Sequence, residues 1–121
     1  MTYDPNNIFA RILRGEIPCK KVMENDHVLA FHDINPGAPV HVLVIPKGAY
    51  VSMADFSAKA SQAEQAALMT AIGDVARQMG VSDSGYRVIS NAGDDGHQEV
   101  PHLHFHVVGG RKLGRMLPRA D

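Results

Sequence analysis

The stretch His102-Leu-His-Phe-His-Val-Val108, near the end of the chain, is the part of the sequence that decides the fold we expect. Alternate residues of a β-strand point to the same side of a sheet, so the three imidazoles share one face. The apolar side chains between them, Leu103, Phe105 and Val107, then share the other face. The pattern predicts a strand with one face in the hydrophobic core and a row of histidines on the other.

A row of three histidines on one face of a strand has three possible explanations. The simplest is that the histidines merely fill strand positions. Metal binding is the second, but His102 and His106 lie roughly 13 Å apart on a flat strand at about 3.3 Å per residue. Zn–N bonds are only about 2 Å long, so all three rings cannot reach one ion unless the strand bends sharply. Two of the histidines with a remote ligand remain an alternative, and no metal is expected.

Chemistry on a phosphate is the third explanation, and the one that we favour. Histidine titrates near pH 6.5, so one ring can be neutral while a neighbouring ring is protonated. A neutral imidazole is a nucleophile, and an adjacent imidazolium can hold a phosphate oxygen or protonate a leaving group. The row therefore predicts covalent and acid–base catalysis on a small phosphate compound.

Working outward, the sequence predicts an α+β domain with a five-stranded antiparallel sheet. Alternating and β-branched segments bounded by turn residues predict strands at 20–24, 28–33, 40–46, 86–91 and 102–108. A short helix is expected to begin at Ile8, after two asparagines, and to end at Gly15. The segment 40–46 is the most β-branched and is expected to be the central strand.

The longest predicted helix begins at Ser61-Gln-Ala-Glu64, which has the spacing of a capping box. It continues for about 18 residues to Met79, and Gly80 is the expected stop. Its apolar stripe packs on the sheet and comprises Leu68, Ile72, Val75 and Met79. We therefore expect one long helix and one short helix.

Composition limits the classes of function. The chain has 121 residues and a net charge of −1, so we expect one domain over 1–121 and no nucleic-acid partner. Cys19 is the only cysteine, which excludes an internal disulfide and suits a reducing compartment. The polar N-terminus does not resemble a secretory signal, and the longest apolar stretches, of about four residues, are too short to span a membrane. A cytoplasmic protein is expected.

The histidine stretch matches the signature of the histidine-triad (HIT) superfamily, in which three histidines alternate with apolar residues. The segments Ile8–Pro18 and Phe31–Lys47, together with Gly109-Gly-Arg111 after the triad, resemble the Hint branch of nucleotide-binding purine nucleoside phosphoramidases. The resemblance covers roughly residues 7–112, and residues 113–121 form a basic tail outside it.

The resemblance implies a HIT-like fold that forms a homodimer, in which two five-stranded sheets join into one of ten strands. It also implies binding of purine mononucleotides (AMP or GMP) and hydrolysis of adenosine or guanosine 5′-phosphoramidates to the nucleoside monophosphate and an amine, with no cofactor. His104 would be the nucleophile that takes the nucleotidyl group, and His106 would contact the phosphate and assist proton transfer. His102 and His41 would complete the histidine cluster.

The nucleotide-binding residues also follow from the resemblance. Asp33 matches the carboxylate that binds both ribose hydroxyls, and Asn91 matches a residue beside the phosphate. Glu99 stands where animal Hint proteins have a serine near the phosphate, which leaves its backbone to make that contact. The expected walls of the base pocket are Ile8, Phe9, Ile17, Phe31 and Ile34.

The tail lacks the Trp-Pro-Pro-Gly ending of animal Hint proteins, so the resemblance does not carry their preference for a leaving group to this chain. Besides the phosphoramidase, two alternatives stay open: a nucleotide-binding regulatory module with incidental hydrolysis, and a dinucleoside polyphosphate hydrolase. Hydrolysis of dinucleoside polyphosphates is the activity of the Fhit branch, and the segment Gly109-Gly-Arg111 after the triad favours the Hint branch over it. A nucleotidyl transferase of the galactose-1-phosphate branch is disfavoured, because that branch has glutamine in place of His106.

Overall fold

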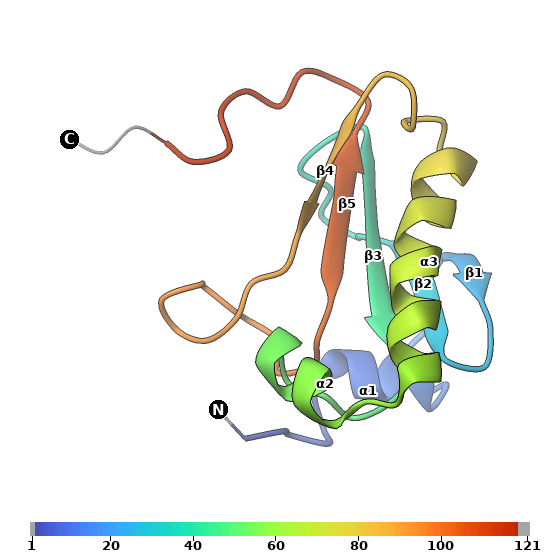
Figure 1. The fold of residues 1–121 in the computed structure, drawn as a ribbon, viewed down its shortest axis with the longest axis vertical. Helices are drawn as coiled ribbons and strands as arrows, with labels where there is room; N and C mark the ends of the chain where they lie inside the picture. Colours follow the sequence, from blue (N-terminus) through green and yellow to red (C-terminus); the bar gives the residue numbers. More distant parts are fainter. Residues whose placement is uncertain (1, 119–121) are drawn as a thin grey trace.

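The computed structural model describes residues 2–118; Met1 and residues 119–121, the end of the predicted basic tail, lie outside the described residues. Figure 1 shows a twisted sheet with the long helix beside it and the C-terminal tail leading away from it. The elements in chain order are α1 (Ile8–Leu13), β1 (Lys21–Glu24), β2 (Val28–His32), β3 (Val40–Pro46), α2 (Met53–Lys59), α3 (Gln62–Gln78), β4 (Tyr86–Ile89) and β5 (Phe105–Gly109).

The sheet has five strands in the order β1-β2-β3-β5-β4, and every pair of neighbours is antiparallel. This confirms the predicted architecture, with β3 in the centre. The register places Leu43 of β3 opposite His106 of β5, and His106 is also opposite Ile89 of β4. His106 therefore lies on the inner part of the sheet, with strands on both sides.

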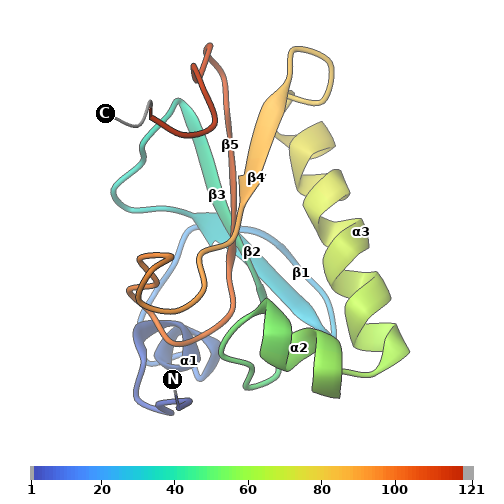
Figure 2. The same ribbon diagram turned by 60° about the vertical axis from the view of Figure 1, so that its left-hand side comes forward.

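The two faces of the sheet are covered differently. Helix α3 lies along one face (Figure 2), where Val42, Val44 and Val107 pack against its apolar stripe. The stripe was predicted correctly: Leu68, Ile72 and Val75 are buried, and Met79 is partly buried against them.

The opposite face carries a second apolar cluster, formed by Phe9, Leu29, Phe31, Leu43 and Ile45. The four members on β2 and β3 alternate with the residues that face α3, as the twofold repeat of a strand requires. Helix α1 contributes Phe9 to this cluster, and its position below the sheet is visible in Figure 2. The face away from α3 is therefore only partly covered, which leaves room for a pocket.

The ends of both predicted helices have the expected caps. The Ser61 side chain accepts a hydrogen bond from the Glu64 amide, while the Glu64 carboxylate accepts one from the Ser61 amide, as in a capping box. At α1, the Asn7 side chain accepts from the amides of Phe9 and Ala10. This cap fixes the start of the helix that carries Phe9.

Three predictions about the elements differ from the structure, the first being the strand predicted over 86–91, which ends at Ile89. Helix α2, begun by Ser52, was not predicted; Asp55 in its first turn accepts a hydrogen bond from the Val51 amide. The histidine strand begins at Phe105 and not at His102, because the preceding residues bond to another loop instead of to a strand: the Leu103 amide donates to the Tyr50 carbonyl at 2.7 Å.

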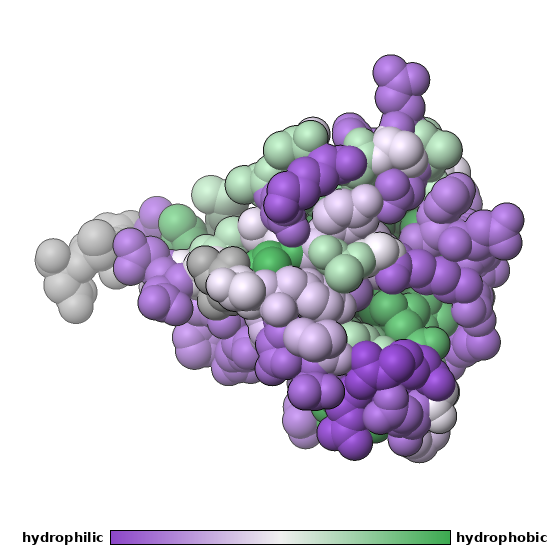
Figure 3. Space-filling model, turned by 90° about the horizontal axis from the view of Figure 1, so that it is seen from below, coloured by the Kyte–Doolittle hydropathy of each residue, from purple (hydrophilic) through white to green (hydrophobic). Residues whose placement is uncertain are grey.

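No helix in the described part of the chain combines the length and the hydrophobicity needed to cross a membrane. The surface at the end where α1 and α2 lie is mostly hydrophilic, with apolar groups gathered in smaller patches (Figure 3).

Candidate active site

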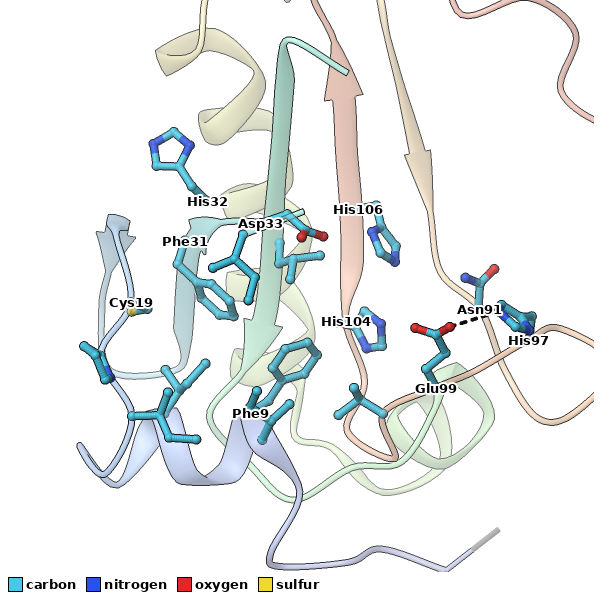
Figure 4. A pocket seen from close by; sticks show the side chains of 17 residues that line it. Phe9, Cys19, Phe31, His32, Asp33, Asn91, His97, Glu99, His104 and His106 are labelled. Atoms are coloured by element: carbon cyan, nitrogen blue, oxygen red, sulfur yellow. Dashed lines mark hydrogen bonds and ion pairs between the residues drawn. The ribbon is translucent and has the colours of Figure 1, made fainter. Parts of the chain in front are cut away.

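A pocket of about 390 Å³ opens on the face of the sheet away from α3. Figure 4 shows His104 and His106 one above the other along β5, with Phe9 and Phe31 to one side and Glu99 and Asn91 to the other. One end of the pocket is thus apolar and aromatic, and the other is polar. A pocket of this size and mixed lining suits a small organic ligand with one polar group.

Most of the site residues predicted from the sequence line this pocket. Ile34 is at its rim and 86% exposed, whereas Phe9 and Phe31 are buried. The predicted residues that line it are Ile8, Phe9, Ile17, Phe31, Asp33, Ile34, Asn91, Glu99, His104 and His106. His102 and His41 do not line it, so the pocket holds two of the three triad histidines.

The histidines that cluster are His41, His104 and His106. The ring centroids of His104 and His106 are 5.1 Å apart, as are those of His41 and His106. Residues 104 and 106 alternate with Phe105 and Val107, which are buried against α3, so the two-residue repeat brings both rings to the pocket face.

The hydrogen bonds of His104 determine which of its nitrogens carries the proton. Nδ1 lies 2.7 Å from the backbone carbonyl oxygen of His102. A carbonyl oxygen only accepts, so Nδ1 is protonated and donates, and in the neutral ring Nε2 then keeps its lone pair. Nε2 has no hydrogen-bond partner among residues 2–118, which leaves it available to a molecule in the pocket.

The same reasoning shows which nitrogens of His41 and His106 carry a proton. The Gly37 amide donates to Nδ1 of His41 at 2.9 Å, so His41 is neutral and protonated at Nε2. That nitrogen lies 2.9 Å from Nδ1 of His106, which accepts the bond. The ring of His106 therefore carries its own proton on Nε2, as a donor at the pocket.

Burial favours the neutral form of His104 and of His106. It lowers the pKa of His104, and the charges of Asp33 and Glu99 oppose that effect. Burial, together with repulsion from His104 and His41, lowers the pKa of His106 to about 4. Burial therefore favours a neutral His106, and the imidazolium expected beside a neutral ring stays a prediction for the site with a bound phosphate, whose negative charge favours the protonated form. Burial acts through desolvation, which disfavours the charged form of histidine.

His102 is fully buried and does not line the pocket, but it lies on the same face as His104: Leu103 between them packs in the core against α3, and the Phe9 ring on the other face contacts both imidazoles, at centroid distances of 6.4 Å and 4.9 Å. Nε2 of His102 lies 2.8 Å from the Pro46 carbonyl oxygen and its Nδ1 lies 2.7 Å from the Tyr3 hydroxyl. The hydrogen-bonded strand begins at Phe105, but the alternation of core and opposite face continues back through Leu103. Burial lowers the pKa of His102 to about 4, so it too is neutral at neutral pH.

Asp33 follows β2 and stands beside the cluster. One carboxylate oxygen accepts from the Asn35 amide at 2.8 Å, and the other lies 3.4 Å from Nε2 of His41. Among residues 2–118, the one set of side chains whose donor atoms could hold a metal is Asp33, His41 and His106, within 4.8 Å of one another. It differs from the triad considered above, and its two histidines already bond to each other, so a metal would have to displace that bond.

At the mouth of the pocket, Glu99 and His97 are both exposed and form an ion-pair contact of 3.0 Å between Oε1 and Nε2. His97 has a φ of 58°, a conformation that is uncommon for a residue other than glycine. The carboxylate of Glu99 raises the pKa of His104 and His106, against the larger effect of burial. Glu99 thus acts on the histidines through its charge.

Several lining residues were not predicted. Leu43 could have been found from the alternation along its strand, because Val42 and Val44 face α3 and Leu43 must face the other way. The remaining ones, which carry no signal in the sequence alone, are Ile12, Pro18, Cys19, His32, His97 and Val100.

Comparison with known proteins identifies relatives along almost the whole chain. The sequence model of the HIT domain matches residues 14–113. A HIT-like protein from Azospirillum brasilense is 67% identical over 98% of this chain and 97% of its own length. The purine nucleoside phosphoramidase of Escherichia coli is 44% identical over 91% of this chain and 92% of its own length. A HIT family hydrolase from Clostridium thermocellum superposes with a TM-score of 0.85 at 38% identity, covering 93% of this chain and 97% of that one.

Proposed function

The chain belongs to the HIT domain family, and we propose that it hydrolyses purine nucleoside 5′-phosphoramidates to the nucleoside monophosphate and an amine. The Escherichia coli relative, named a purine nucleoside phosphoramidase, supports the reaction class. The observation that carries the proposal is the state of His104: a neutral ring whose Nδ1 proton is held by a backbone carbonyl and whose Nε2 lone pair is available to the pocket.

Two displacements at phosphorus account for the reaction. In the first, the Nε2 lone pair of His104 forms a bond to phosphorus while the P–N bond breaks. The amine leaves with the electron pair of that bond and takes the Nε2 proton of His106, which we propose is held as an imidazolium by the negative charge of the bound phosphate, so that the ring becomes neutral as the amine departs. In the second, water attacks phosphorus, the bond to His104 breaks and its electron pair returns to Nε2, while a proton from the water restores His106.

The rest of the pocket supports the choice of a nucleotide. Phe9 and Phe31, with ring centroids 5.7 Å apart, offer an apolar site for a flat base. We assign the ribose to Asp33, since a carboxylate accepts both hydroxyl hydrogens of a diol. We assign Asn91 and the backbone at Glu99 to the 5′-phosphate of the AMP or GMP derivative.

The experiment that tests this function compares turnover on a panel of substrates under the same conditions: adenosine and guanosine phosphoramidates, a diadenosine polyphosphate and an adenosine acyl phosphate. We expect the phosphoramidates to give the highest kcat/KM. Faster cleavage of the diadenosine compound would favour the dinucleoside polyphosphate hydrolase. Tight binding of AMP without turnover of any member would favour the regulatory module.

We further propose that the protein is a homodimer. Strand β4 is an edge of the sheet, and three of its four side chains are apolar and exposed: Tyr86, Val88 and Ile89 are 42%, 40% and 37% exposed. An edge strand has unpaired main-chain N–H and C=O groups, and with apolar side chains it tends to pair with another strand. We propose that this strand is β4 of a second copy. The free thiol of Cys19 is compatible with the cytoplasmic location that we also propose.

A further inference from the structure

We infer that Tyr3 is a positioning residue for His104, and that it acts through the buried ring of His102. The inference rests on the proposed function, in which His104 is the nucleophile. Tyr3 does not line the pocket, and it stands near the start of the chain, 101 positions before His104. Its effect must therefore pass through the groups between them.

The first link joins Tyr3 to His102. The tyrosine hydroxyl lies 2.7 Å from Nδ1 of His102, and Nε2 of the same ring lies 2.8 Å from the Pro46 carbonyl oxygen. Because the carbonyl only accepts, Nε2 carries the proton and Nδ1 must accept from the hydroxyl. Both polar atoms of a fully buried ring are thereby satisfied, and both partners select the same tautomer.

The second link joins His102 to His104. The backbone carbonyl of His102 accepts the Nδ1 proton of His104 at 2.7 Å. This bond sets both the tautomer and the direction of the nucleophilic ring. The ring of His102 is anchored at its two nitrogens, so the peptide that follows it has little freedom to move. Tyr3 and Pro46 thus help to fix the carbonyl that aims Nε2 of His104.

The segment that carries Tyr3 is itself anchored. The Asp4 carboxylate accepts from the Asn6 amide at 2.9 Å, and the Asp4 carbonyl accepts from the Asn7 side chain at 2.7 Å. The Arg14 guanidinium donates to the Pro5 carbonyl at 2.7 Å. These bonds tie residues 4–7 to α1, the helix that also supplies the aromatic wall of the pocket. A tyrosine on a free end could not hold a buried ring in one orientation.

Loss of the hydroxyl would leave Nδ1 of His102 buried without a donor. The other tautomer would not relieve this, because an unprotonated Nε2 would then face the Pro46 carbonyl. The ring must shift or admit water, and the carbonyl that holds His104 shifts with it. Displacement of a reacting group by about 1 Å can lower a rate by about 100-fold, so a smaller shift is expected to lower kcat by about tenfold.

The test compares Tyr3→Phe with the matched control Tyr50→Phe. The control also removes one tyrosine hydroxyl, which donates to Glu64 on α3 at 2.7 Å, and, because it changes only the side chain, it keeps the bond from the Leu103 amide to the Tyr50 carbonyl. With adenosine phosphoramidate as substrate, we expect kcat to fall about tenfold in Tyr3→Phe with KM changed by less than about twofold. The control is expected to retain the kcat of the unmodified protein.

A second measurement does not depend on activity. The ¹⁵N shifts of the histidine rings report which nitrogen is protonated and whether it is hydrogen-bonded. In Tyr3→Phe we expect the His102 and His104 signals to change while those of His41 and His106 stay in place. Unchanged signals of His102 and His104, or equal kcat in Tyr3→Phe and the control, would overturn the inference. No turnover by the unmodified protein would instead contradict the proposed function, and the ring signals would still decide the role of Tyr3.

Discussion

The reactivity of individual side chains in this protein depends on the direction of a few hydrogen bonds. A backbone carbonyl accepts a hydrogen bond from Nδ1–H of His104, and a backbone amide donates a hydrogen bond to Nδ1 of His41. One ring consequently offers a lone pair, and its neighbour His106 offers an N–H. Two neighbouring rings thus present opposite hydrogen-bonding groups to the pocket, and main-chain groups determine which ring presents which.

Asp33 is predicted to bind the ribose. Asp33→Asn should lower kcat/KM for adenosine phosphoramidate about 10- to 100-fold, the effect of losing a hydrogen bond to a charged group. A 2′-deoxyadenosine substrate provides the control, since it already lacks one of the two hydroxyls. The variant should lose less with it, and the two changes should be non-additive in a double-mutant cycle. Equal losses with both substrates would contradict the assignment.

Glu99 is predicted to set the acid limb of the pH profile. His104 attacks only when neutral, so kcat/KM falls as the pH drops through its pKa. The charge of Glu99 raises that pKa, so Glu99→Gln should lower it and move the acid limb to lower pH. Asp95→Asn removes an exposed charge from the same loop and should leave the limb in place. A limb that moves to higher pH, or equally in both variants, would contradict this role.

The sequence predicted the directions of side chains that repeat along a strand and missed the contacts that distant parts of the chain make with them. The positions of His104 and His106 follow from the two-residue repeat alone. The complete burial of His102 does not follow from it, because its ring is enclosed and bonded by Tyr3 and Pro46, which are distant in sequence. The Tyr3–His102 bond, between residues 99 positions apart, has no local signal at all.

Among the helices and strands, those with a strong periodic pattern were predicted most accurately. The capping box and the apolar stripe of α3 agree with the structure to within a residue at each end. Helix α2, with seven residues and one fully buried side chain, has too short a pattern to be recognised. The pocket helix α1 is also short, and its Asn7 cap compensates for its few turns.

Asn7 therefore provides a test of how α1 supports the pocket. Asn7→Ala removes a cap and should lower the free energy of unfolding by about 1 kcal/mol, and it should raise KM because Phe9 is held less firmly. Ser61→Ala removes the cap of α3, on the other side of the sheet, and should cost a similar amount of stability. Urea unfolding and steady-state kinetics on both variants are the measurements. A rise in KM in both would mean that it reflects stability and not the pocket.

The described molecule is a sheet with a long packing helix on one face (Figure 2) and the candidate active-site pocket on the other. The sequence predicted this division, because the histidines and the core residues alternate along one strand. It did not predict the outline of the pocket, which is assembled from α1, β2, the residues after β2 and the loop before β5.

The exposed apolar edge leads to a prediction about assembly. Light scattering after size exclusion should give about twice the 13.1 kDa of one chain for the unmodified protein. Val88→Lys should shift the mass toward one chain, because a charge at the proposed interface loses its hydration without gaining a partner. Lys112→Ala, outside the strand, is the control. A single-chain mass for the unmodified protein would contradict the dimer.

The bond between His104 and phosphorus is the central claim, and it can be tested directly. Adenosine 5′-phosphoramidate is mixed with the protein, the reaction is quenched within milliseconds at alkaline pH, and the peptides are analysed by mass spectrometry. We predict an adenylyl group on the peptide that contains His104, and neither adduct nor turnover in His104→Asn. Full turnover by that variant, or an adduct on another residue of the unmodified protein, would contradict the account.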